Sequence, residues 1–173
     1  MGRDWAIHRY SAPMPTADAQ RLIDALALAP HPEGGHFRRF HEAAIQVEHN
    51  GIRRPAMTAI HYLLEPGGRS QWHRVDADEA WHWQQGDALE LMQFDVVAEA
   101  VTCTRLGPGS DDARMCVVPA GTWQSAHAPG GHALVACVVA PGFAWPGFEL
   151  LDPVQAPAAL RACLATPACP SSD

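Results

Sequence analysis

The sequence lacks any apolar run of the about 20 residues that a membrane-spanning helix needs. It also lacks a basic surplus, because 12 Lys and Arg residues stand against 19 Asp and Glu residues, giving a net charge of −7 at pH 7. Nucleic-acid phosphates attract basic surfaces, so this balance argues against a nucleic-acid partner. The first residues lack the apolar segment of a signal peptide. We therefore expect a cytoplasmic protein that binds neither membranes nor nucleic acid.

Closely spaced cysteine pairs are missing as well. The five cysteines are an odd number and include no Cys-x-x-Cys motif of the kind found in redox or zinc sites. Cys116 and Cys137 lie in Val-rich runs, which is typical of small buried thiols. We expect no catalytic cysteine.

Length and composition indicate one domain, since 173 residues with 47% hydrophobic content can build one core but are few for two. Thr16 suits a helix N-cap, and apolar residues recur at helical spacing until Pro30, which predicts a helix over 16–29. A short helix is expected over 156–164. The predicted divisions are an irregular arm (1–15), a domain that includes the first helix (16–152), and a C-terminal helix with a tail (153–173).

After residue 35 the pattern changes to short strand-like segments separated by Gly and Pro turns. Many short strands at such spacing predict a mainly β sandwich or closed barrel rather than alternating strands and helices. The aromatic-rich stretch 141–148 is expected to be an irregular cover. The expected strands are 36–48, 57–64, 70–75, 79–85, 88–95, 98–105, 114–119, 122–128 and 132–140.

The stretch 67–86 concentrates the residues that carry chemistry. It contains His73, Glu79, three tryptophans and glycines at both ends. Two adjacent strands joined by a short loop would bring His73 and Glu79 to one concave face. We expect the working site here. Its predicted aromatic walls are Trp72, Trp81 and Trp83.

These residues resemble the first cupin motif, to which Gly67, His73, Glu79 and Gly86 fit, while 119–121 fits the core of the second. Five motifs in consistent order over roughly residues 18–152 resemble the cupin-5 (DUF985) family more closely. The resemblance implies a double-stranded β-helix (jelly-roll barrel), usually dimeric, with a ligand pocket in its mouth and no settled activity. The motifs are His31-Pro32-Glu33-Gly34-Gly35, Trp72-His73-Arg74-Val75, Asp78-Glu79-Ala80-Trp81-His82, Val118-Pro119-Ala120-Gly121-Thr122-Trp123-Gln124 and Val139-Ala140-Pro141-Gly142-Phe143.

The sequence departs from the metal-binding cupins at their ligand positions. Those cupins offer three His and one Glu, whereas Val75 and Gln124 occupy the second and third His positions here. His73 and Glu79 alone are fewer donors than Zn²⁺ or Fe²⁺ usually takes. Strand alternation turns His82 to the face opposite Glu79. We therefore assign no cofactor from the sequence, and a divalent metal stays an alternative. Its ligands would be His73, Glu79, Gln124 and, through a β-bulge, His82.

Without a metal, His73 and Glu79 form an acid/base pair. The carboxylate is expected to favour the protonated imidazole, and burial among tryptophans to raise the pKa of Glu79. Such a pair can remove a proton next to a carbonyl group or protonate a leaving hydroxyl. We expect Gln124 to donate a hydrogen bond to the substrate, Glu33 to lie on a loop over the barrel mouth, and Tyr62 to line the pocket.

The resemblance implies a homodimeric cupin, and together with the site residues it predicts that the protein binds a small polar metabolite, sugar-like or nucleotide-linked, between aromatic walls. The predicted reaction is metal-independent isomerisation, epimerisation or elimination, catalysed by His73 and Glu79. Two alternatives stay open: a non-catalytic small-molecule-binding cupin, and a metal-dependent cupin oxygenase or isomerase. A buried His–Glu contact that only stabilises the fold is the simplest alternative for the pair itself.

Overall fold

Two antiparallel sheets make up most of the protein, for which a computed structural model describes residues 16–164. The predicted arm (1–15) and the end of the predicted tail lie outside the described residues. One sheet has the spatial order β1 (Ala29–Pro30), β2 (His36–Glu42), β5 (Thr58–Leu64), β12 (Ala133–Ala140), β7 (Asp78–Gly86) and β10 (Met115–Val118). The other has the order β13 (Phe148–Leu150), β6 (His73–Val75), β11 (Trp123–His127), β8 (Leu89–Asp95) and β9 (Ala100–Leu106).

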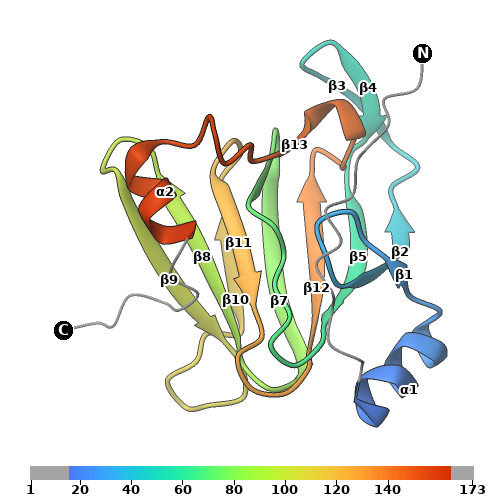
Figure 1. Ribbon diagram of the computed structural model, residues 1–173. Helices are drawn as coiled ribbons and strands as arrows, with labels where there is room; N and C mark the ends of the chain where they lie inside the picture. Colours follow the sequence, from blue (N-terminus) through green and yellow to red (C-terminus); the bar gives the residue numbers. More distant parts are fainter. Residues whose placement is uncertain (1–15, 165–173) are drawn as a thin grey trace.

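The two sheets pack face to face around a shared core (Figure 1). Tyr62, Trp81 and Val135 of the first sheet meet Leu91 and Ala126 of the second there. Inward and outward side chains alternate along the strands, as a strand with one buried face requires. The mainly β, double-stranded β-helix predicted from the sequence is confirmed.

One predicted strand is two. The stretch 36–48 divides because the chain turns after β2, and β3 (Gln46–His49) instead pairs with β4 (Ile52–Pro55) in a separate hairpin. The turn of this hairpin is Asn50-Gly51, with both residues at positive φ. Asn-Gly is a favoured two-residue hairpin turn, so the sequence contained a signal for β4, which was not among the expected strands.

Both helices cover outer faces of the sheets (Figure 1). In α1 (Ala17–Leu26) the Thr16 side chain accepts a hydrogen bond from the Ala19 backbone N–H, as expected of an N-cap. The helix ends earlier than predicted because Ala27 adopts a left-handed conformation. The second helix, α2 (Ala158–Leu164), packs over the outer face of the five-stranded sheet through Leu160. Neither helix has the length and apolarity that a bilayer span requires.

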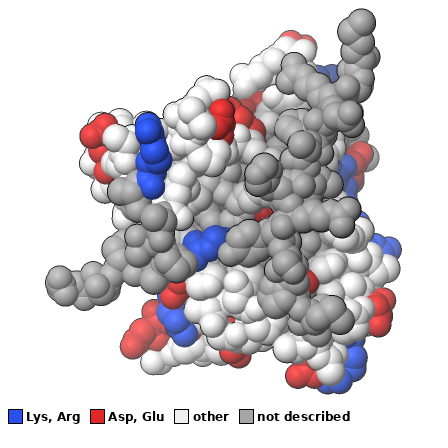
Figure 2. All heavy atoms as spheres, viewed as in Figure 1, with Lys and Arg blue, Asp and Glu red and all other residues white. Residues whose placement is uncertain are grey.

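The aromatic cover is partly regular. A 3₁₀ turn, η1 (Trp145–Gly147), leads into β13, whose Phe148 pairs with Val75 of β6. The cover is therefore fixed to the strand that carries His73. On the face drawn in Figure 2, Arg side chains are scattered among Asp and Glu side chains, and the described residues form no continuous basic surface there.

Candidate functional site

A cavity of about 300 Å³ lies between the sheets at one end of the barrel. Its polar lining includes two histidines and two carboxyl groups, those of His31, Glu33, His73 and Glu79. The free thiol of Cys137 lines it too, and burial raises its pKa. The aromatic wall consists of Phe37, Phe143, Trp145 and Phe148.

Strand register brings three of the predicted site residues together. His73 on β6 is the direct cross-strand partner of Gln124 on β11. Glu79 enters from the opposite sheet near the start of β7, where it pairs with Val118 of β10 and Val139 of β12. Residues from distant parts of the chain thus meet because two facing sheets present their inner faces to one space.

Glu33 reaches the same space on the loop between β1 and β2. Gly34 and Gly35 both have positive φ, and a Cβ atom at either would lie under 3 Å from a backbone oxygen of Arg69 or Leu63. Only glycine allows this close approach, which presses the loop against the barrel. The Glu33 carbonyl oxygen accepts a hydrogen bond of 2.7 Å from the backbone N–H of Gln71. The loop therefore holds the Glu33 side chain inside the barrel, where it is buried.

The carboxylate that contacts His73 is Glu33. Its Oε2 lies 3.2 Å from Nε2 of His73, while the other ring nitrogen, Nδ1, lies 2.8 Å from the carbonyl oxygen of Gln71. A carbonyl accepts only, so Nδ1 carries the proton and Nε2 of the neutral ring is an acceptor. A protonated Glu33 then donates to Nε2. The sequence predicted Glu79 as the partner of His73, because a contact with Glu33, 40 positions away, leaves no local pattern in the sequence.

Burial sets the protonation of the group. It raises the pKa of Glu33 to about 8 and that of Glu79 to about 7, since desolvation disfavours the carboxylate. Burial also lowers the pKa of His73 and outweighs the opposing effect of the Glu79 charge. Burial lowers the pKa of His31 to about 4, and repulsion between the protonated forms of His31 and His73 contributes less. The rise at Glu79 has the expected direction, whereas the expectation of a favoured imidazolium at His73 is wrong.

Gln124 orients Glu79. Its Oε1 accepts a hydrogen bond of 2.9 Å from the indole N–H of Trp81, and its Nε2 donates to Oε2 of Glu79 at 2.6 Å. An indole N–H only donates, so it fixes which end of the amide faces Glu79. Gln124 is buried and does not line the cavity. The structure thus gives it a partner in the protein in place of the expected substrate oxygen.

The same geometry argues against a metal at this position. A metal ligand must offer a lone pair, but Gln124 presents its NH₂ group toward Glu79. His82 is exposed and contacts Gln84 on the outer face of β7. Across the described residues, no three His, Cys, Asp or Glu side chains converge so as to hold a metal ion. The donor set does not fit the metal of the metal-binding cupins.

The three predicted tryptophans do not line the cavity. Trp72 points outward and packs with Leu160 under α2. Trp81 and Trp83 share the inward face of β7 with Glu79, but each successive inward residue lies about 7 Å further along a strand, away from the cavity. Trp81 is buried in the core, and Trp83 donates its N–H to the Asp87 carbonyl oxygen beyond it.

Tyr62 binds the loop that carries Glu33. Its hydroxyl donates to the Gly34 carbonyl oxygen at 2.8 Å, and the ring is fully buried beside Trp81. It does not line the cavity, contrary to the expectation. Its interaction with Glu33 lowers the pKa of that carboxyl, though less than burial raises it.

Several cavity residues were not predicted from the sequence. His31 stacks on Trp145, with ring centroids 6.3 Å apart, and the Phe148 ring lies 5.6 Å from that of His73. Arg39 is also part of the lining. The sequence could have indicated this position of Arg39, because Phe37 and Arg39 are two positions apart on one strand and so share a face.

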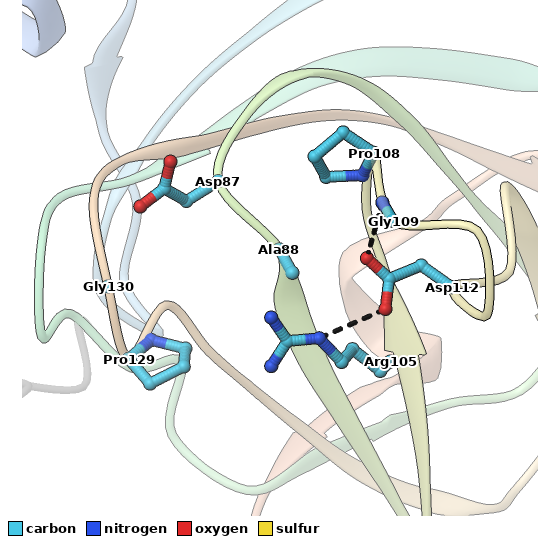
Figure 3. A pocket seen from close by; sticks show the side chains of 8 residues that line it. All are labelled: Asp87, Ala88, Arg105, Pro108, Gly109, Asp112, Pro129 and Gly130. Carbon is cyan, nitrogen blue, oxygen red and sulfur yellow. Dashed lines mark hydrogen bonds and ion pairs between the residues drawn. The ribbon is translucent and has the colours of Figure 1, made fainter.

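A second cavity, of about 260 Å³, lies among the loops that follow β7 and β9 (Figure 3). Two of its charged side chains, Asp87 and Asp112, already bind groups in the loops around it. Asp112 accepts from the Gly109 N–H at 2.8 Å and pairs with Arg105 at 3.0 Å, and Asp87 accepts from the Gly131 N–H. No His or Cys is among its eight lining residues. The first cavity is therefore the better candidate site.

Comparison with known proteins agrees with this architecture. The family model described as "Cupin_5: Cupin superfamily (DUF985)" matches residues 20–151. A hypothetical protein from Leishmania major is 30% identical, with a TM-score of 0.72, over 79% of this chain and 89% of that one. A protein from Shewanella oneidensis is also 30% identical, with a TM-score of 0.72, over 83% and 88% of the two chains.

More distant structures share the fold alone. Oxalate decarboxylase from Bacillus subtilis is 16% identical, with a TM-score of 0.54, over 76% of this chain and 32% of that one. No curated protein matches the chain.

Proposed function

The chain belongs to the Cupin_5 (DUF985) family of the cupin superfamily, and we propose that its barrel cavity binds a small polar metabolite and transfers protons on it without a metal. The observation that carries the proposal is the contact between Glu33 and His73 in a cavity that also holds Glu79. Two carboxyl groups with different partners and raised pKa values can act as an acid and a base at neutral pH.

The size and lining of the cavity support the proposed ligand class. A volume of about 300 Å³ is at the small end of the usual range for ligand pockets. Phe37, Trp145 and Phe148 offer apolar faces that suit the ring of a sugar or of a nucleotide-linked sugar. The proposed aromatic wall therefore comes from β2 and from the stretch 141–148, and not from the three tryptophans expected from the sequence.

Glu79 is the proposed base and Glu33 the proposed acid. In its ionised form Glu79 takes a proton from a substrate carbon next to a carbonyl group, and the C–H electron pair passes to the carbonyl as an enolate. Glu33 then breaks its hydrogen bond to His73 and gives its proton to carbon in an isomerisation or epimerisation, after which proton exchange with water returns Glu79 to its ionised form and Glu33 to its acid form. In an elimination it protonates the leaving hydroxyl, which departs as water while the C–O bond breaks. His73 accepts a hydrogen bond from Glu33 and holds that acid in place.

A non-catalytic binding cupin is the second candidate. It is favoured by the fact that both ring nitrogens of His73 already have partners within the protein. A cytoplasmic homodimer, as expected from the sequence and the family resemblance, remains part of the proposal.

The test begins with native mass spectrometry of freshly purified protein to identify a retained ligand. Incorporation of deuterium from D₂O into that ligand, followed by NMR, then measures proton transfer at carbon. Glu79→Gln should keep ligand binding and slow incorporation by about a hundredfold or more, as loss of a general base does. Glu149→Gln is the matched control, because Glu149 is exposed and pairs with Arg74.

Incorporation that Glu79→Gln leaves unchanged would overturn the assignment of the base. A ligand that binds the wild-type protein without any incorporation would favour the non-catalytic candidate.

A further inference from the structure

Arg39 places a positive charge at the rim of the cavity. Among the described residues that line the cavity, it is the only Arg or Lys. Its position follows from regular alternation along β2, because Arg39 lies two residues after Phe37 and shares its inward face. The register against β5 shifts only after Arg39, where Phe40 occupies a bulge. Arg39 is thus the last inward residue of β2 before the bulge, with its guanidinium at the cavity mouth.

The protein partner of Arg39 is easily replaced. Its Nη1 lies 2.7 Å from Oε2 of Glu42, and these side chains are 41% and 50% exposed. Water screens an ion pair that is this exposed, so it adds little to stability. A ligand anion partly shielded from water in the cavity mouth would compete with Glu42 for the guanidinium, because such an ion pair is less screened.

The deeper end of the cavity suits uncharged groups. Glu33 and His73 present a hydrogen-bonded acid and ring there, next to Glu79. A negative charge beside an ionised Glu79 would be repelled, whereas a hydroxyl or carbonyl group would be accepted. The rim of the cavity therefore favours an anionic group, and its deep end favours an uncharged polar group. A ligand that fits both has one anionic end and one neutral, polar end.

We propose that the metabolite bound in this cavity carries one anionic group, a carboxylate or a phosphate ester, which Arg39 binds at the rim. The hydroxyl-bearing body then lies along Phe37 and Trp145, and its reacting carbon faces Glu79. This inference rests on the proposed function and adds the substrate class.

Three probes with the same hexose body separate the sources of the anion: D-glucose, D-glucuronate and D-glucose 6-phosphate. Their affinities are measured by calorimetry and by NMR of the Arg side-chain N–H signals. At least one anionic probe should bind about tenfold or more tightly than glucose, as expected for a charge-assisted hydrogen bond. The better of the two anionic probes identifies the carboxylate or the phosphate ester.

The variants test the direction of the effect as well as its presence. Arg39→Gln should remove the preference for the anion, whereas Glu42→Gln should strengthen anion binding because it frees Arg39. Arg38→Gln is the matched control, since Arg38 is the neighbouring residue, faces away, and donates to the Leu26 carbonyl oxygen. It should leave all three affinities unchanged.

The proposal is overturned if glucose binds as tightly as both anions, if neither anion binds at millimolar concentration, or if Arg39→Gln leaves anion affinity unchanged. The two proposals fail separately. Glutamate-dependent deuterium incorporation into glucose itself would keep the acid/base site and reject the anionic class. Anion binding through Arg39 without such incorporation would keep the class and reject the chemistry.

Discussion

The Nε2 atom of His73 lies 3.2 Å from Oε2 of Glu33, so a loop residue and a strand residue 40 positions apart share one proton site. Because Nδ1 of the ring is committed to the Gln71 carbonyl, the shared proton belongs to Glu33 when the ring is neutral. Glu79 stands apart from this contact with its own donor, Gln124. Two carboxyl groups thus have separate supports within one cavity.

The rate of deuterium incorporation should have a narrow pH optimum. It should rise as the pH passes about 7, because Glu79 must lose its proton to act as a base. It should fall above about 8, because Glu33 must keep its proton to act as an acid. The pH profile of the wild-type protein and of Glu33→Gln, measured by NMR, checks this. Glu33→Gln should lose the alkaline limb, and an unchanged alkaline limb would count against Glu33.

The free energy of unfolding should fall between pH 6.5 and 8. Folding raises the pKa of Glu33 from 4.5 to about 8, so the folded state holds a proton that the unfolded state has lost. The stabilisation is full below pH 4.5 and is lost as the pH rises through about 8. Glu79 acts in the same direction up to about 7. The neutral, buried His31 and His73 oppose this only below 6.5, their unfolded value.

Urea unfolding at pH 6.5 and 8 measures this slope. Glu33→Gln should flatten it and stabilise the protein at pH 8, by an amount on the order of 1 kcal/mol or more. Glu149→Gln, at an exposed ion pair, should leave the slope as it is. If the free energy of unfolding depends on pH as strongly in Glu33→Gln as in the wild type, other groups cause the dependence.

Restoring the missing ligand positions should create a metal site. Val75 lines the cavity, and Gln124 is the cross-strand partner of His73. The double variant Val75→His/Gln124→His would offer three imidazoles and Glu79, a donor set that divalent transition metals favour. Elemental analysis of protein prepared without a His-tag should find about one metal per chain in the double variant and far less in the wild type. Stoichiometric metal in the wild type that is lost in His73→Ala would show that the natural residues do bind a metal, despite the orientation of the Gln124 amide.

Removing Asp76 should destabilise the fold. Its carboxylate binds Arg54 through both oxygens, at 2.7 and 2.8 Å, and the Arg54 side chain is 1% exposed. Arg54 holds the pKa of Asp76 below its usual range. Asp76→Ala leaves a buried charge without its partner, which costs about 3–5 kcal/mol in comparable buried pairs. Chemical denaturation measures the loss.

Glu149→Gln breaks the exposed pair with Arg74 and serves as the control for this loss. It should cost no more than about 1 kcal/mol. Equal losses in the two variants would show that the Arg54 contact is no stronger than a surface pair.

Much of the fold was predictable because it depends on local patterns. Period-two apolar residues and Gly or Pro turns defined most strands, and Thr16 marked the start of α1. The family resemblance, carried by five short motifs, is confirmed by the match over 20–151. The strand β4 was missed although the Asn50-Gly51 turn before it indicates a hairpin.

The composition of the site was partly predictable, since His73 and Glu79 do line one cavity. Their partners were not. Glu33 reaches His73 only because the Gly34-Gly35 loop packs against a strand end, and Gln124 reaches Glu79 only across facing sheets. Contacts between segments far apart in the chain have no local periodicity from which to infer them.

The sequence by itself determined the class of fold, the family, and two ionisable residues of the cavity, because alternation and motif spacing are properties of neighbouring residues. The tertiary structure alone decided which carboxyl group meets the imidazole, which way the Gln124 amide faces, and which aromatic rings form the wall. Desolvation also depends on the whole assembly. Burial makes the His73 ring neutral and Glu33 an acid at neutral pH, although the sequence favoured the reverse for the ring.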